Sequence, residues 1–249
     1  MSLKLDYQIG SATHAGKVRL ENQDRCVSFS LPDSKGCVIL VADGMGGHMG
    51  GSIAAEITTE SIRTVFNKPF RKPEQALKES LIGAQSKMVS KAAKIPEFKN
   101  MGTTVSAACY FNNKVYTAHI GDSRIYKFNS TDTTQISTDH SFVQEMIRQG
   151  VLTPVQARNH PDDNVLVRAL TASFYDPPDI PNPIQPRAGD VFLVCSDGLW
   201  KMLTDDEMQK VVVTKDAQEA ADELVNMANA NGGKDNIAVS ILKITTNKP

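Results

Sequence analysis

Short apolar runs separated by polar turns are the main pattern along this chain. Runs of this length are typical of buried β-strands, and Val, Ile and Tyr favour strands further. The Asn112-Asn113 pair separates two of the runs, as in a β-hairpin, so we expect antiparallel pairing. The predicted strands are residues 36–42, 103–110, 114–120, 191–195 and 236–244.

Helical periodicity occupies other stretches of the chain. Residues 52–65 place three isoleucines near one face, and Pro73 opens a helix that runs to about residue 94. Residues 217–230 form a third helix, which ends before the Gly232-Gly233 pair. Because helices arrive in blocks rather than after every strand, the pattern predicts an α+β fold, with sheets in the middle and helices outside.

Residues 139–187 break this pattern. They combine short helical pieces with five prolines between Pro177 and Pro186. Proline removes backbone donors and favours turns, and periodic apolar positions are few here. We therefore expect an irregular, mobile flap over the body, within a single domain that covers residues 1–249.

Composition excludes several classes of protein. The 249 residues carry 27 basic and 28 acidic side chains, a net charge of −1, so a broad basic surface for nucleic acid is not expected. No stretch approaches 18 consecutive apolar residues, and the first residues lack the apolar segment of a signal peptide. The four cysteines show no CxxC spacing. We expect a monomeric, soluble, cytoplasmic protein that does not associate with a membrane.

One motif occurs twice at the ends of apolar runs. Residues 38–42 lead into Asp43-Gly44, and residues 191–195 lead through Ser196 into Asp197-Gly198. Each pattern delivers a carboxylate at a strand end, followed by a residue that permits an unusual backbone turn and can direct a carbonyl oxygen at the same ligand. Mg²⁺ and Mn²⁺ prefer such oxygen ligands. The alternative is that Asp-Gly is simply a common turn dipeptide.

Three further aspartates lie in loops beside predicted strands: Asp24, Asp122 and Asp235. If these loops converge with the two Asp-Gly turns, several carboxylates share one pocket. Two unit charges about 4 Å apart repel by about 4 kcal/mol at an effective dielectric constant near 20. Such carboxylates would not stay ionised together without cations, so a convergent cluster implies a metal site.

Seven short motifs occur along the chain in a fixed order. They are Arg19-x-x-Asn22-Gln23-Asp24, residues 41–48 around Asp43-Gly44, Gly102-Thr103-Thr104, Gly121-Asp122-Ser123-Arg124, residues 164–170, Ser196-Asp197-Gly198-Leu199 and Gly233-x-Asp235-Asn236. Together, over residues 10–243, their order and approximate spacing resemble those of the metal-dependent (PPM, type-2C) protein phosphatases. The form with Met45-Gly46-Gly47-His48 is similar to the bacterial branch.

The resemblance implies a fold, a reaction and a role for each site residue. The fold is a four-layer α-β-β-α sandwich of two antiparallel sheets, and residues 1–249 form one phosphatase catalytic domain with a flap at about 139–187. By position, Asp43 bridges two Mn²⁺ or Mg²⁺ ions, the Gly44 carbonyl binds one of them, and Asp197 and Asp235 bind the other. Asp24 holds metal-bound water, Arg19 grips the substrate phosphate, and Asp122 binds a weaker third cation.

The chemistry of this family suits these residues. A divalent cation lowers the pKa of bound water from 15.7 towards about 7. The resulting bridging hydroxide attacks the phosphorus of phosphoserine or phosphothreonine in line, while the metals and Arg19 stabilise the developing charge. The implied partners are a phosphorylated protein and a cognate serine/threonine kinase whose action the enzyme reverses in signalling.

Two positions depart from the family pattern. Some relatives carry a histidine after the first Asp-Gly as general acid, but this chain has Met45, so the leaving group takes its proton from water or from His48. His48, flanked by glycines, is also a candidate for substrate binding. Many relatives have an aspartate four residues after Asp197, where this chain has Lys201, which puts the third cation in doubt.

Two other functions have partial support in the sequence. Residues 46–52 resemble a phosphate-binding loop of a nucleotide-binding protein, but Ser52 follows Gly51, so the lysine that meets the phosphates is missing. A catalytically inactive relative that acts as a binding module is the second rival. Such proteins typically lose metal ligands, whereas Asp43, Asp197 and Asp235 are all present.

Overall fold

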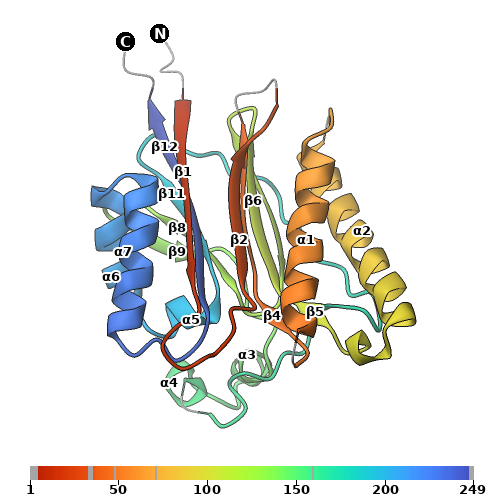
Figure 1. Cartoon of the computed structure of the whole chain (residues 1–249). Coiled ribbons are helices and arrows are strands. Elements are labelled where there is room, and N and C mark those ends of the chain that lie inside the picture. Colours follow the sequence, from red (N-terminus) through yellow and green to blue (C-terminus); the bar gives the residue numbers. More distant parts are fainter. Residues whose placement is uncertain (1–4, 33–35, 48, 71, 159, 247–249) are drawn as a thin grey trace.

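The computed structural model describes residues 5–32, 36–47, 49–70, 72–158 and 160–246. Two antiparallel sheets lie face to face at its centre (Figure 1). The first has the strand order β1-β12-β11-β8-β9 and the second β2-β3-β6-β7. Their bounds are β1 Leu5–His14, β2 Arg25–Ser30, β3 Cys37–Ala42, β6 Val105–Phe111, β7 Lys114–Ile120, β8 Arg124–Phe128, β9 Thr133–Gln135, β11 Val191–Cys195 and β12 Ile237–Thr246.

Helices cover the outer face of each sheet, so the predicted α+β sandwich of four layers is confirmed. Helices α1 (Gly50–Phe66) and α2 (Pro73–Lys94) pack on the second sheet, with Ile62 and Leu81 in a core shared with Val38 and Leu40. Helices α6 (Asp205–Thr214) and α7 (Ala217–Ala230) pack on the first sheet. Among the described helices, none is long and apolar enough to span a membrane.

A third core lies between the two sheets. Ile39 and Val41 of β3 meet Phe192 and Val194 of β11 there, and all four side chains are fully buried. Burying each such side chain contributes roughly 1.5–3 kcal/mol to stability. Because both faces of these strands are covered, their sequences are apolar without alternation, which is why they could be recognised.

Several predicted elements have the observed bounds. Helices α2 and α7 and strands β7 and β11 begin and end at the predicted residues. Asn112 and Asn113 both have positive φ, as the turn of a two-residue hairpin between β6 and β7 requires.

One predicted strand is divided. Residues 103–110 were expected to form one strand, but Thr104 separates β5 (Gly102–Thr103) from β6. Strand β5 joins β4 (Gly44–Met45) and β10 (Leu170–Thr171) in a small third sheet that was not predicted. This sheet connects the residues after Asp43 to the flap.

The flap is irregular, as predicted, and lies at the end of the sandwich where β3, β7 and β11 finish (Figure 1). It contains two short helices, α3 (Phe142–Arg148) and α4 (Pro154–Ala157). Its proline-rich part bonds along the edge strand β7, because Asp179 and Ile184 each exchange two backbone hydrogen bonds with that strand. The prolines therefore cover a sheet edge that would otherwise expose unpaired backbone groups.

Candidate metal and phosphate site

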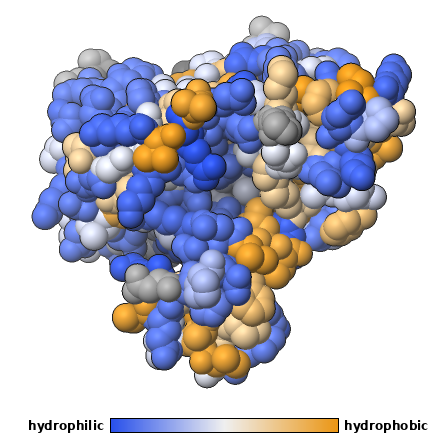
Figure 2. All heavy atoms as spheres, turned by 60° about the horizontal axis from the view of Figure 1, so that its bottom comes forward, coloured by the Kyte–Doolittle hydropathy of each residue, from blue (hydrophilic) through white to orange (hydrophobic). Residues whose placement is uncertain are grey.

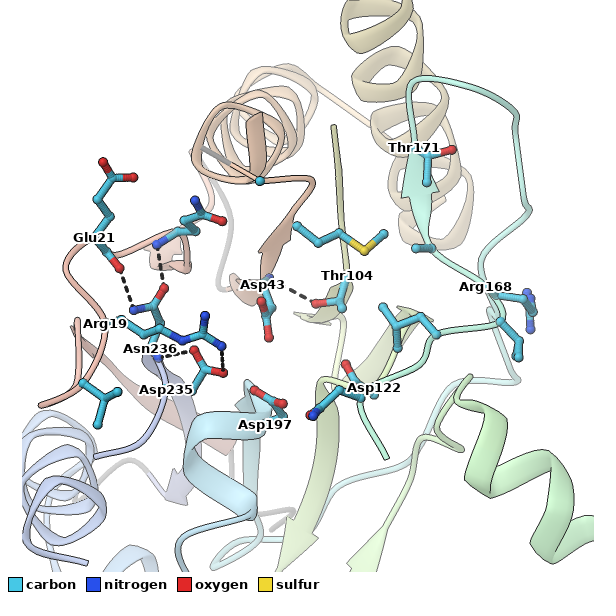
Figure 3. Close-up of a pocket in the computed structure, with 18 of the residues that line it drawn as sticks. Arg19, Glu21, Asp43, Thr104, Asp122, Arg168, Thr171, Asp197, Asp235 and Asn236 are labelled. Atoms are coloured by element: carbon cyan, nitrogen blue, oxygen red, sulfur yellow. Dashed lines mark hydrogen bonds and ion pairs between the residues drawn. The ribbon is translucent and has the colours of Figure 1, made fainter. Parts of the chain in front are cut away.

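The five predicted aspartates converge at one end of the sandwich. Asp43 follows β3, Asp122 follows β7, and Asp235 precedes β12. Asp197 is the first residue of α5 (Asp197–Trp200), directly after β11 and Ser196. Antiparallel order in both sheets brings these strand ends to the same edge, and the four carboxylates point towards one another in Figure 3.

A cavity of about 900 Å³ opens above these carboxylates. Figure 2 shows this end of the molecule, where mostly hydrophilic residues line the hollow beside the projecting flap. Exposed apolar side chains stand around the rim, among them Leu20 on one side and Val167 and Phe174 of the flap on the other. The site is thus a charged floor with partly apolar walls.

Asp43 is fixed by Thr103 of β5 and by Thr104, which lies between β5 and β6. The backbone N–H of Asp43 donates to Thr104 Oγ1 at 3.1 Å, and its carbonyl accepts from Thr104 N and from Thr103 Oγ1, both at 2.9 Å. Thr104 therefore interrupts the predicted strand to hold Asp43. Both threonines belong to a recognised motif, although the sequence alone assigned them no role.

Asp24 is held by Ser196. Ser196 Oγ donates to Asp24 Oδ2 at 2.6 Å and accepts from Ala238 N at 2.9 Å. The backbone N–H of Asp24 donates to Asn22 Oδ1 at 3.1 Å. Both Asp24 and Ser196 are buried, so the Ser196 hydroxyl rather than bulk water orients this carboxyl group.

Burial and mutual repulsion dominate the electrostatics. Burial and the charges of Asp24, Asp197, Asp122 and Asp235 hold the pKa of Asp43 well above its ordinary value. Burial, with the nearby charge of Asp197, raises the pKa of Asp24 to about 7, even though Ser196 donates to it.

The pKa of Asp122 is raised by the same two effects. Burial and the charge of Asp197 raise its pKa to about 8, and the ammonium of Lys201 opposes this shift. Asp24, Asp43 and Asp122 are thus carboxyl groups that resist ionisation, and divalent cations would stabilise such a set of oxygen donors in its charged form.

The glycines after Asp43 and Asp197 serve close packing. Neither Gly44 nor Gly198 has positive φ, so the predicted unusual turn is wrong. A Cβ on Gly44 would lie 2.2 Å from the Gly51 carbonyl oxygen, and one on Gly198 would lie 1.9 Å from the Asn236 carbonyl oxygen. Gly44 therefore packs against the backbone at the start of α1, and Gly198 against the loop that carries Asp235, approaches that only glycine allows.

Arg19 lies beside the cluster on the loop between β1 and β2. Its Nη2 donates to Asp235 Oδ2 at 2.8 Å, and Asp235 raises the pKa of the guanidinium. Asn236 holds this loop, because its Nδ2 donates to the carbonyls of Ala15 and Glu21 at 2.9 and 2.8 Å. The side chain of Arg19 is 58% exposed at the cavity mouth, within reach of an anion that enters.

Two carboxylates of the cluster pair with cationic side chains. Asp235 meets Arg19, and Asp197 Oδ2 lies 3.0 Å from Lys201 Nζ. Within the described ranges, no three Asp, Glu, His or Cys side chains already have a geometry that would hold a metal ion. The oxygen donors nevertheless fit Mg²⁺ or Mn²⁺ by chemical type.

The histidines divide into two groups. His48 lies outside the described residues, so its predicted part in substrate binding or proton transfer stays a prediction. His119 and His140 are buried, with ring centroids 4.8 Å apart. His119 contacts Ser106 Oγ and the Thr138 carbonyl, and burial lowers its pKa to about 4.

The sequence of the whole chain is similar to those of known protein phosphatases. Residues 12–240 match the family model described as Protein phosphatase 2C. The serine/threonine phosphatase stp of Listeria monocytogenes is 32% identical over 249 residues, which cover 93% of both chains. The serine/threonine protein phosphatase PstP of Mycobacterium tuberculosis is 30% identical over 92% of this chain and 43% of its own length.

Solved structures show the same architecture. The crystal structure of the M. tuberculosis phosphatase PstP/Ppp superposes with a TM-score of 0.87 at 29% identity, over 95% of this chain and 98% of that one. The catalytic domain of PstP in complex with two manganese ions also gives 0.87, at 28% identity, over 97% of this chain and all of that one. The chain therefore belongs to the protein phosphatase 2C family, as its motifs predict, and is a protein phosphatase.

Proposed function

We propose that this chain hydrolyses phosphoserine and phosphothreonine in proteins, using two divalent cations, Mn²⁺ or Mg²⁺, held by the aspartate cluster. One observation carries the proposal. Asp43, half-buried at the cavity floor, lies among Asp24, Asp122, Asp197 and Asp235, and their charges all raise its pKa. Such an arrangement opposes stability unless cations bind, so its presence at the floor of an open cavity favours a catalytic metal site over a structural one.

We assign each residue a role consistent with its place. Asp43, at the centre of the cluster, would bridge the two cations, with the Gly44 carbonyl on one and Asp197 and Asp235 on the other. Asp24 is buried and fixed by Ser196, so it suits an outer position that orients water. The cations would supply Lewis acidity and an activated water for attack on phosphorus.

Arg19 would bind the phosphate group of the substrate. Among the described residues its guanidinium bonds to Asp235 alone, and a guanidinium has five N–H donors, so it can contact Asp235 and a phosphate together. Paired N–H donors match phosphate oxygens well, and the charge developing on them is stabilised in the transition state. The pairing with Asp235 would hold Arg19 at the cavity mouth before substrate arrives.

The partners follow from the reaction. The substrate would be a phosphorylated protein whose modified segment enters the cavity beside the flap, and the reaction would reverse a serine/threonine kinase. The relatives named above are serine/threonine phosphatases, which supports this substrate class. The leaving oxygen would be protonated by water or by His48.

Hydrolysis of a phosphothreonine peptide and of p-nitrophenyl phosphate tests the proposal. The metal-stripped protein should release no phosphate from either, and Mn²⁺ or Mg²⁺ should restore turnover. Turnover that persists in excess chelator would contradict the metal site. Mn²⁺ binding without hydrolysis of either substrate would support an inactive binding module instead.

A further inference from the structure

Lys201 lies where the sequence pattern of the family predicts a ligand of a third cation. Its Nζ is 3.0 Å from Asp197 Oδ2 and 3.5 Å from Asp163 Oδ2, and it donates to Asn164 Oδ1. Asp197 belongs to α5, whereas Asp163 and Asn164 belong to the flap. One ammonium group therefore joins the floor of the site to the flap.

The surroundings fit a cation built into the protein. An ammonium has three N–H donors, and three side-chain oxygens lie around this one, one from α5 and two from adjacent flap residues. The Lys201 side chain is 20% exposed and Asp197 13%, so solvent screens this contact less than an ordinary surface ion pair. The flap partner Asn164 is 37 residues away along the chain, so the contact has a tertiary role that an i,i+4 helix pair lacks.

The segment that carries Lys201 is itself fixed. Trp200 Nε1 donates to the Asp122 carbonyl at 3.0 Å, and the Arg124 guanidinium stacks 3.5 Å from the centre of the indole ring. Arg124 is in turn held by Asp139, with three hydrogen bonds of 2.8 to 3.1 Å. The position of the ammonium is thus set by the packing of α5, with little freedom to leave.

We propose that the Lys201 ammonium takes the place of a third divalent cation, so that the site works with two cations. The contacts of Lys201 with Asp197, Asp163 and Asn164 then join the flap to α5 through a charge that is part of the chain, and we call these contacts the latch. This inference rests on the proposed two-metal function. A divalent cation at this place would dissociate as its concentration fell, and the flap contact would be lost with it. Lys201 cannot dissociate, so the latch persists whether or not metal is bound.

The number of cations bound tests the replacement. Isothermal titration of the metal-stripped protein with Mn²⁺ should give two sites per chain, and Lys201→Asp should add a third, weaker site. Lys114→Asp, the same change at the exposed start of β7, should leave two and controls for adventitious binding. Three sites in the wild type, or still two in Lys201→Asp, would overturn the proposal. Fewer than two in the wild type would contradict the two-metal function itself.

Hydrogen exchange of the metal-free protein tests the latch without any metal. Lys201→Met should speed amide exchange in flap residues 160–167 by about tenfold, while β11 exchanges as before. Lys201→Arg, which keeps the charge, should restore slow exchange. Lys215→Met is the matched control. It breaks the 2.5 Å ion pair between Lys215 Nζ and Glu219 Oε1, which is not part of the site. Flap exchange unchanged in Lys201→Met would overturn the latch.

Discussion

Asp43 is the residue on which the account of the site depends most. We expect Asp43→Asn to abolish Mn²⁺-dependent turnover, because an amide cannot replace a carboxylate that bridges two cations. The same change should stabilise the metal-free protein by about 1 kcal/mol or more, since it removes a carboxyl group whose ionised form is repelled by four neighbouring aspartates. That corresponds to a rise in Tm of about 2–4 °C for each kcal/mol at this size.

Asp222→Asn on the exposed face of α7 is the matched control for this change, and should alter neither property. Turnover of more than a few per cent in Asp43→Asn, or a metal-free protein less stable than the wild type, would contradict the role of Asp43. Asp197→Asn should behave like Asp43→Asn in turnover, although its ion pair with Lys201 makes its effect on stability smaller.

Arg19 is expected to contribute more to substrate binding than to metal binding. Arg19→Ala should raise the KM for a phosphopeptide by at least about tenfold, because a charge-assisted donor to phosphate is lost. Mn²⁺ affinity should stay the same or improve, because Asp235 no longer pairs with a guanidinium. Steady-state kinetics and calorimetry separate the two effects. Arg148→Ala, which breaks an exposed arginine–glutamate pair, is the control, and parallel loss of Mn²⁺ affinity and activity in Arg19→Ala would contradict the assignment.

At the scale of elements, the flap is expected to set substrate preference. A groove of about 810 Å³ runs between the flap and α5, with Gln144, Ile147 and Arg158 on its flap side. Replacing these three by alanine should change kcat/KM for phosphopeptides by about tenfold and leave p-nitrophenyl phosphate turnover within a few-fold. The small substrate needs only the metals and Arg19, whereas a peptide also needs the groove wall.

The matched control replaces Arg148, Gln149 and Val155, which lie on the same flap segment but do not line the groove. It should leave both substrates unaffected. Equal losses on both substrates in the groove variant would show that the flap supports the metal site directly, and the specificity assignment would then be wrong.

Elements with a simple pattern could be predicted from the sequence, and those that depend on distant partners could not. Helix α2 has proline at its start, and β11 is an unbroken apolar run, so both were recognised with correct bounds. Strand β1 has a half-buried pattern and gains its place only by pairing with β12, and it was missed. Helix α6 was also missed, although Thr204 and Glu207 form a capping box at its start.

The site shows the same division. Motif order identified the five aspartates, because each lies directly beside a strand end. The partners that hold them, such as Ser196 for Asp24 and Asn236 for the Arg19 loop, join positions far apart in the chain. Lys201 was recognised as a departure, but its contact with Asn164 depends on the path of an irregular flap that no local pattern specifies.

For the whole molecule, the cluster predicts how stability depends on pH. An acid whose pKa is higher in the folded than in the unfolded chain binds more protons when folded, so the free energy of unfolding falls as pH rises between the two values. For Asp24 this window runs from 3.8 to about 7, and Asp122 extends it to about 8. The shift of Asp24 alone lowers the free energy of unfolding by at most about 4 kcal/mol across this window, at about 1.36 kcal/mol for each pKa unit.

Urea denaturation of the metal-stripped protein at pH 5 and pH 8 measures this effect. We expect lower stability at pH 8, and a reversed trend in saturating Mn²⁺, which binds the ionised carboxylates and so gains affinity as they lose protons. Asp24→Asn should flatten the metal-free trend. Metal-free protein that is more stable at pH 8 than at pH 5 would show that these carboxyl groups do not control it.

The aspartates at the end of the sandwich are expected to hold two divalent cations about Asp43. Anomalous diffraction from crystals grown with Mn²⁺ is the decisive measurement, because it locates the ions without reference to activity. We expect two anomalous peaks in contact with the Asp43 carboxylate, one also contacting Asp197 and Asp235, and none where Lys201 meets Asn164. Peaks that do not contact Asp43, or a single peak at full occupancy, would contradict this two-cation site.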